Sequence, residues 1–397
     1  GSITDVRTFF PSPLQLLHDS SQKSLRVSGL RIHPKSYLGG GMYALGTSYR
    51  ATFLLCLLSL ARGWKAPSKF LIISSPQNGT IGYVKLSQRT NMSRDEVSTL
   101  ISDGLHHPQG IAVDQKRHRL LVADPDLGKL VSYSLRLSGD SVSVTGEPAV
   151  VADGVSPRWV AVDGSGNVFF SEEGEDQILT VPWDAEGTAP RLVFDKDAPV
   201  RAPGGIASDN YFVYWINKEE GTSSGLVVRG SQYQGSADNA TTLARLTTPI
   251  GKEDEEASAT LEPTVLSSAT GKGYGVCVAR DVVFFTAESQ EVYQVSRDPA
   301  APSLAQSGTD KANLVTNQLV SPRGCAFDGQ EAVYVADRSN NAVYEFPSTA
   351  GVLQTSLVKL VDYEGAFGVA VVSGGTYRLC ARLVWAMLLL CTWRMSC

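Results

Sequence analysis

Ser321-Pro-Arg-Gly-Cys-Ala-Phe-Asp328 is the sharpest of several related segments in this 397-residue chain. Five variants of it occur: His107-Pro-Gln-Gly-Ile-Ala-Val-Asp114, Ser156-Pro-Arg-Trp-Val-Ala-Val-Asp163, Ala202-Pro-Gly-Gly-Ile-Ala-Ser-Asp209, Gly273-Tyr-Gly-Val-Cys-Val278 and Gly365-Ala-Phe-Gly-Val-Ala-Val371. We call the glycine of each segment, or the residue in its place, the mark; the marks are Gly110, Trp159, Gly205, Gly275, Gly324 and Gly368. Their spacings of 49, 46, 70, 49 and 44 residues match the blade period of a β-propeller.

Two short apolar runs follow each of the first five marks. Examples are Leu120–Asp124 with Leu130–Tyr133, and Ala332–Asp337 with Val343–Phe346. They are rich in β-branched and aromatic residues and are bounded by Gly, Asp, Asn or Ser, which predicts strands joined by tight turns. A single small sheet cannot bury both faces, whereas sheets packed in a ring can.

The two ends of the repeat region complement each other. Phe70–Ser74 and Ile81–Val84 form a pair of runs with no mark before them, whereas the mark Gly368 has no pair after it. Placing Val369–Val372 beside Phe70–Ser74 builds one composite blade and removes two open sheet edges. The sequence therefore predicts an all-β, six-bladed propeller over residues 66–372, with a charged loop insertion at about 231–263 between blades 4 and 5.

Charge separates this body from its flanks. Residues 66–372 hold 24 basic and 38 acidic residues, a formal net charge of −14, whereas 1–65 and 373–397 are basic. So acidic a body repels phosphate backbones, which argues against a nucleic-acid partner. No run of 18 apolar residues is present, which argues against a stable membrane span.

Residues 42–65 have the layout of a secretory signal peptide. Arg50 precedes the 11-residue apolar run Ala51–Ala61, and small residues follow it. On this interpretation residues 1–41 precede the natural start, and 373–397 form a short basic and apolar tail outside the propeller. The sequons at Asn78, Asn91 and Asn239 are candidate glycosylation sites, so we expect a secreted or secretory-pathway glycoprotein.

The best-formed repeats resemble the NHL-repeat family and its six-bladed relatives. Ser321–Asp328 followed by Val333–Val343 is similar to an NHL unit, and Tyr214-Trp-Ile-Asn217 resembles the YWTD unit of lipoprotein-receptor propellers. The resemblance covers about residues 66–372 and implies that Asp337 and Asn341 hold the turn between the second and third strands of their blade through side-chain to backbone hydrogen bonds. The other repeat aspartates, Asp114, Asp163, Asp209 and Asp328, receive the same structural interpretation.

Related six-bladed propellers include gluconolactonase-like hydrolases, which use a central calcium ion. That chemistry requires several inward-facing acids and amides. Glu172, Asn217 and Glu288 occupy equivalent strand ends, but such ends are normally turns. The three histidines of the body all lie in blade 2, so zinc ligation from several blades is excluded. We expect no catalytic residues, no metal site and no cofactor; a calcium-dependent lactonase or esterase is the alternative.

The residues immediately before the marks predict a ligand site at one mouth of the central channel. Arg158 and Arg323 belong to opposite blades, and aromatic residues lie nearby in the repeat. Two guanidinium groups beside aromatic rings on an acidic body suit a carboxylate, a sulfate or an acidic peptide. The candidate ligand-binding residues are Gln109, Arg158, Trp159, Tyr274, Arg323 and Phe367. A non-enzymatic protein-binding or peptide-binding module is the leading interpretation.

Two cysteines of the repeats, Cys277 and Cys325, fall in the first strands of neighbouring blades. They lie two residues and one residue after their marks. Because successive residues of a strand point to opposite faces, we expect no disulfide bond between them and predict two buried thiols.

Overall fold

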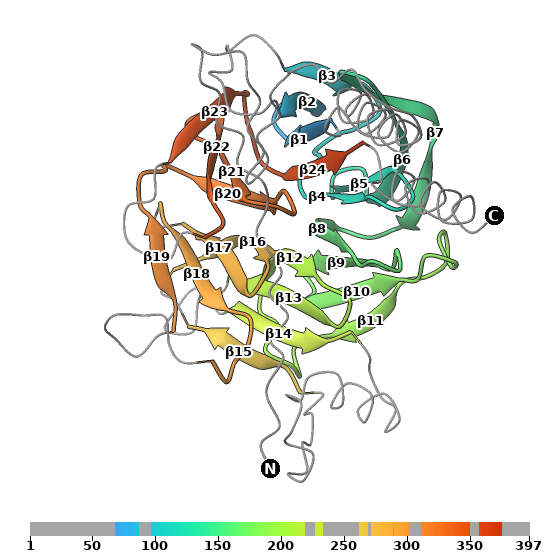
Figure 1. Ribbon diagram of the computed structural model, residues 1–397. Coiled ribbons are helices and arrows are strands. Elements are labelled where there is room, and N and C mark those ends of the chain that lie inside the picture. Colours follow the sequence, from blue (N-terminus) through green and yellow to red (C-terminus); the bar gives the residue numbers. More distant parts are fainter. Residues whose placement is uncertain are drawn as a thin grey trace, which may run out of the picture. The chain divides into compact units, whose positions relative to one another are not determined.

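The computed structural model describes residues 68–86, 97–218, 227–232, 262–268, 271–288, 290–301, 311–349 and 357–374. Within these ranges the chain forms six antiparallel sheets of four strands each and no α-helix. The first strands of consecutive sheets contact one another in a closed cycle, so the sheets are the blades of a six-bladed β-propeller (Figure 1). The predicted fold class is confirmed.

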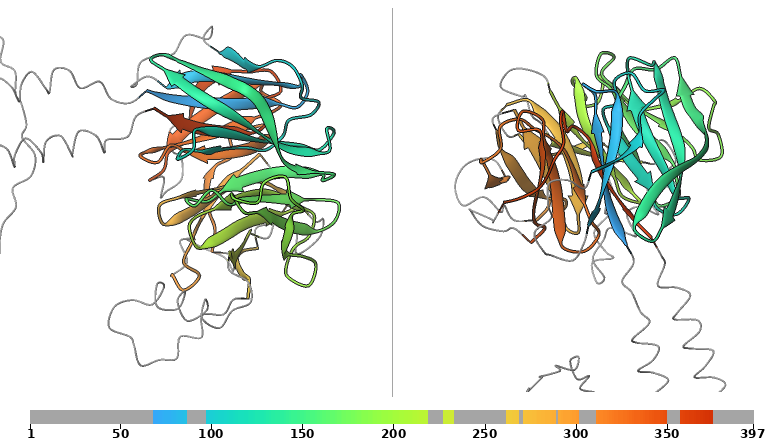
Figure 2. Two further views of the ribbon diagram at one scale, coloured as in Figure 1. Left: turned by 90° about the vertical axis from the view of Figure 1, so that its right-hand side faces the viewer. Right: turned by 90° about the horizontal axis from the view of Figure 1, so that it is seen from above.

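Blade 1 is the composite sheet. Its order is β24 (Val369–Ser373), β1 (Lys69–Ser75), β2 (Thr80–Leu86) and β3 (Ser98–Ile101). Phe70 pairs with Val372 and Ile73 with Val369, so the predicted pairing of these two segments is confirmed. Figure 2 shows the two strands, from opposite ends of the repeat region, side by side.

The other five blades follow the chain in order. Blade 2 holds β4 (Ile111–Asp114), β5 (Arg119–Asp124), β6 (Lys129–Ser138) and β7 (Ser141–Asp153); blade 3 holds β8 (Pro157–Val162), β9 (Val168–Glu172), β10 (Gln177–Val181) and β11 (Arg191–Phe194). Blade 4 holds β12 (Pro203–Ser208), β13 (Phe212–Asn217), β14 (Val227–Ser231) and β15 (Thr264–Ser267). Blade 5 holds β16 (Gly273–Ala279), β17 (Val282–Ala287), β18 (Val292–Ser296) and β19 (Asn313–Thr316), and blade 6 holds β20 (Pro322–Phe327), β21 (Ala332–Asp337), β22 (Ala342–Pro347) and β23 (Val358–Asp362).

The position predicted for the loop insertion is wrong by one strand. The insertion separates β14 from β15, and β15 pairs with β14. It therefore lies within blade 4 and not between blades 4 and 5. The prediction failed because β15, the strand that completes blade 4, follows the insertion and has only four residues. A segment that short cannot be distinguished from a loop by its sequence pattern. Most of the insertion, the proposed signal segment 42–65, residues 1–41 and the tail from 375 lie outside the described residues.

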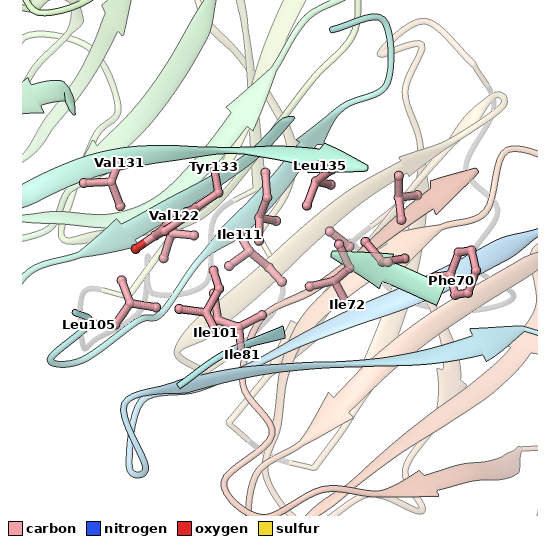
Figure 3. Close-up of a cluster of buried hydrophobic side chains, with 14 residues drawn as sticks. Phe70, Ile72, Ile81, Ile101, Leu105, Ile111, Val122, Val131, Tyr133 and Leu135 are labelled. Carbon is pink, nitrogen blue, oxygen red and sulfur yellow. The ribbon is translucent and has the colours of Figure 1, made fainter. Parts of the chain in front are cut away.

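Apolar side chains fill the spaces between neighbouring blades. Figure 3 shows the cluster between blades 1 and 2, where Phe70 and Ile72 of β1 meet Ile111 of β4 and Leu135 of β6. The second strands, such as Arg119–Asp124, are buried along almost their whole length, because they lie inside a blade that is covered on both faces. This arrangement explains their continuous apolar runs.

The marks permit the close approach of backbones around the axis. A Cβ atom on Gly110 would lie 2.5 Å from Cα of Trp159, and one on Gly275 would lie 2.2 Å from the carbonyl oxygen of Arg323. Only glycine fits at that spacing. Neighbouring blades are also joined directly, because the amide of Gly110 donates to the carbonyl of Arg158 at 3.0 Å.

Among the described residues, no helix is long and apolar enough to cross a membrane.

Candidate functional site

Three of the six predicted site residues meet at the end of the ring axis where the first strands begin. Arg158 lies on β8, Tyr274 on β16 and Arg323 on β20. The guanidinium carbon of Arg323 lies 3.7 Å from the centre of the Tyr274 ring, a close cation–π contact. We call Arg158, Glu173, Lys218, Tyr274 and Arg323 together the proximal cluster.

Lys218, which sequence reasoning missed, connects the predicted residues. Its Nζ lies 5.5 Å from the centre of the Tyr274 ring and 2.5 Å from Oε2 of Glu173. The same Glu173 oxygen lies 3.6 Å from Nε of Arg158. The cluster thus holds three cations and one carboxylate, and it takes side chains from four consecutive blades.

Burial and charge both act on Lys218. Burial lowers the pKa of its ammonium group, Glu173 opposes that effect, and the positive charges of Arg158 and Arg323 lower the pKa further. Burial likewise lowers the pKa of Arg323 and raises the pKa of Tyr274. A site with excess positive charge in a partly desolvated setting attracts an anion more strongly than an exposed one does.

A signal for Lys218 was present in the repeat. The residue before the mark carries a side chain in five blades, whereas in blade 4 it is a glycine, Gly204. A Cβ atom at Gly204 would lie 3.3 Å from Cγ of Lys218 and 3.0 Å from the carbonyl oxygen of Gly273. The missing side chain at Gly204 therefore leaves the space through which the Lys218 stem passes.

The other three predicted residues are buried and occupy the interior of the ring. Trp159 stacks on Phe367 with ring centres 5.2 Å apart. A Cβ atom on Gly324, in the opposite blade, would lie 3.2 Å from the Trp159 ring, so this ring reaches across the axis. Gln109 is 6% exposed, and its carbonyl accepts a hydrogen bond from Oγ of Ser74 at 2.6 Å. These three residues thus pack in the interior of the ring and are not members of the proximal cluster.

Hydroxyl groups on the second strands fix the backbone of the residues before the marks. Oγ1 of Thr286 accepts from the Gly275 amide at 2.8 Å and donates to the carbonyl of Arg323 at 2.7 Å. Ser74 makes the same link from blade 1, and Ser171 donates to the carbonyl of Gly204 at 2.9 Å. Arg323 and Gly204 are thereby held in place by neighbouring blades.

The possible calcium ligands at the strand ends serve the fold. Glu172 accepts the Ser156 amide at 2.6 Å, and Asn217 accepts the Arg201 amide at 2.9 Å. Glu288 accepts the Tyr274 hydroxyl at 3.3 Å. In the part of the chain that the structure describes, no three His, Cys, Asp or Glu side chains are grouped so that they could hold a metal ion.

The repeat aspartates have the structural role that the sequence predicts. Oδ1 of Asp163 accepts the amides of Ser165, Gly166 and Asn167 in the turn after β8. Asp337 accepts the amides of Val320 and Ser321 in the loop that leads into its own blade, and it also holds the turn between β21 and β22 by accepting from the Asn340 side chain at 2.8 Å. Asn341 differs from the prediction, because its side-chain oxygen accepts the amide of Gly365, outside that turn. Such carboxylates are occupied by turn amides and are unsuited to a further ligand.

The prediction of two separate thiols at Cys277 and Cys325 is wrong. The two residues form a disulfide bond with Cα atoms 5.7 Å apart. Their side chains do leave their strands on opposite faces, but neighbouring blades pack face to face, so the opposite faces of two adjacent blades are the ones that meet. The bond therefore joins blade 5 to blade 6 beside the axis.

Of the three sequons, only Asn78 falls among the described residues. It is exposed in the turn between β1 and β2. Asn91 and Asn239 lie outside the described residues.

Comparison with known proteins supports the fold alone. No protein-family profile and no curated protein matches the chain. A chain from the crystal structure of a nidogen/laminin complex is similar, with a TM-score of 0.54 and 16% identity over 76% of this chain and 98% of that one. Virginiamycin B lyase from Staphylococcus aureus gives a TM-score of 0.44 and 9% identity over 73% of this chain and 80% of that one. A gluconolactonase from Xanthomonas campestris gives a TM-score of 0.45 and 12% identity over 66% of this chain and 78% of that one.

Proposed function

We propose that this chain is a non-enzymatic, NHL-like propeller that binds a protein or peptide ligand at the proximal cluster. The observation that carries the proposal is the charge of the site: three cations and one carboxylate gather on a body with a formal net charge of −14. Positive charge concentrated on an acidic protein suits an acidic segment of the ligand and steers it to the site.

The position of the aromatic residues supports binding over catalysis. Trp159 and Phe367 are buried in the interior of the ring, and the polar groups at the strand ends are engaged in the fold. The charged and aromatic side chains of the proximal cluster are therefore the surface that a ligand would meet. A surface of this kind suits contact with another polypeptide. The similar chain in the nidogen/laminin structure, itself taken from a complex of two proteins, agrees with this proposal.

We place the protein in the secretory pathway or outside the cell. The Cys277–Cys325 bond is of the kind that persists in oxidising compartments. The exposed Asn78 sequon and the signal-like segment at 42–65 agree with export.

The test is the binding of a fluorescein-labelled hexaglutamate peptide, followed by fluorescence anisotropy. We expect Arg158→Ala/Arg323→Ala to weaken binding at least about ten-fold, and added salt to weaken binding to the unmodified protein. The matched control is Arg136→Ala/Arg191→Ala, which removes the same charge from exposed positions on β6, the third strand of blade 2, and on β11, the outer strand of blade 3. Equal affinities for the two double variants would overturn the proposal, as would lactone hydrolysis dependent on bound calcium.

A further inference from the structure

Glu173 occupies the position that a ligand carboxylate would take in the proximal cluster. A single oxygen of its side chain serves both Lys218 at 2.5 Å and Arg158 at 3.6 Å. Glu173 lies in the turn between β9 and β10, and its side chain is 30% exposed. A carboxylate on an exposed turn can move away from its partners more readily than one on a strand.

Two cations of the proximal cluster, Lys218 and Arg323, are held more firmly than Glu173 itself. The amide of Lys218 donates to the carbonyls of Arg201 and Ala202, and its side chain is only 15% exposed. The carbonyl of Arg323 is fixed by Thr286, and its guanidinium group rests on Tyr274. When Glu173 moves, Lys218 and Arg323 remain in place, and Lys218 has lost its carboxylate partner.

Arg323 offers a ligand carboxylate an ion pair that Glu173 does not make, and this favours displacement of Glu173. Among the described residues, no carboxylate lies within ion-pair distance of its guanidinium group. An incoming carboxylate can therefore reach Lys218 and Arg323 on the Tyr274 ring, a combination that Glu173 does not satisfy. Pairing with an unneutralised, partly buried cation is the stronger interaction.

We propose that Lys218 is an anion-binding residue and that Glu173 is an internal counter-ion which a carboxylate of an acidic peptide displaces. This inference rests on the proposed function and adds a way in which the protein selects among ligands. Glu173 satisfies Lys218 and Arg158 in the free protein, and it competes with weakly charged ligands. Only a segment with enough negative charge to outcompete it gains access to the cluster.

The experiment measures binding of the labelled hexaglutamate peptide to four variants. Glu173→Gln removes the competing charge and keeps the size of the side chain, so we expect about five-fold tighter binding. Lys218→Met keeps the apolar stem and removes the ammonium group, and we expect weaker binding. In the double variant Glu173→Gln/Lys218→Met, we expect most of the gain from Glu173→Gln to disappear, because the cation that Glu173 neutralises is absent.

The fourth variant is the matched control. Glu186→Gln also removes one carboxylate from an ion pair, with Arg119, but Glu186 follows β10 whereas Glu173 precedes it. The two glutamates therefore lie at opposite ends of the blade, and we expect Glu186→Gln to bind like the unmodified protein.

The outcomes separate this inference from the proposed function. Tighter binding by Glu173→Gln alone supports both. If the unmodified protein binds the peptide and Glu173→Gln binds it equally or less tightly, the counter-ion role is refuted and the proposed function stands. If the unmodified protein and Glu173→Gln both fail to bind, the proposed function is refuted and the inference falls with it.

Discussion

The disulfide bond between blades 5 and 6 leads to a quantitative prediction for stability. Cys277 and Cys325 are 48 residues apart in the sequence, so the bond closes a long loop in the unfolded chain. In the chain-entropy description a loop of that length restricts the unfolded state by about 4 kcal/mol at 25 °C. We therefore expect loss of the bond to lower the free energy of unfolding by about that amount.

Two independent perturbations remove the bond. Reduction of the unmodified protein leaves both sulfur atoms in place, whereas Cys277→Ala/Cys325→Ala removes them from a site where the two residues are 6% and 9% exposed. We expect reduction to cost about 4 kcal/mol and the double variant to cost somewhat more, since it also loses buried sulfur contacts. With an m-value of about 3 kcal/mol per M in urea, the midpoint falls by about 1.3 M.

The assay is urea unfolding followed by circular dichroism, with and without reductant. We expect reductant to shift the midpoint of the unmodified protein and to leave the midpoint of the double variant unchanged. Peptide mapping without reduction identifies the linked peptides directly. The reasoning is refuted if the mapped protein carries the bond and reduction leaves the urea midpoint unchanged.

Two further predictions concern the residues that hold the cluster in place. Gly275→Ala puts a methyl group 2.2 Å from the Arg323 carbonyl oxygen, so we expect at least about 3 kcal/mol of destabilisation, whereas Gly174→Ala, with open space around it, should have little effect in the same urea titration; equal effects would contradict the close approach. Thr286→Val leaves the Gly275 amide and the Arg323 carbonyl without their shared hydroxyl, so we expect a loss of about 1–3 kcal/mol and weaker peptide binding. Thr145→Val, on an exposed stretch of β7, is its control, and a Thr286→Val protein as stable as this control would refute the role of the hydroxyl.

The sequence predicts the ring because the ring depends on local patterns. The marks, the apolar second strands and the turn-forming aspartates each act within one blade, so each can be recognised along the chain. The composite blade could be predicted as well, since one end lacked a first strand and the other lacked its partners. Phe70 and Val372, which are far apart in the sequence, pair as the composite blade requires.

Contacts between two blades could not be predicted from the sequence. Whether Cys277 and Cys325 can bond depends on which faces of neighbouring sheets oppose each other, which the alternation within one strand does not reveal. The direction of the Trp159 ring depends on the space left across the axis by Gly324. Lys218 could not be predicted from the residues before the marks, because it follows the second strand of its blade.

Departures from the repeat gather around one end of the axis, and this supports a site there. Blade 3 has Trp159 in place of the mark glycine, and blade 4 has Gly204 where the other blades have a residue with a side chain. Blade 5 has no proline two residues before its mark, and the residue directly before the mark is Tyr274. A repeat that served the ring alone would have no need for these exceptions, since the regular segment already packs well in blade 6. In the structure the three exceptions have a common result. Trp159 fills the interior, Gly204 makes room for Lys218, and Tyr274 receives both Lys218 and Arg323 on its ring. The irregular positions therefore build the cationic cluster, and the regular ones build the ring that holds it.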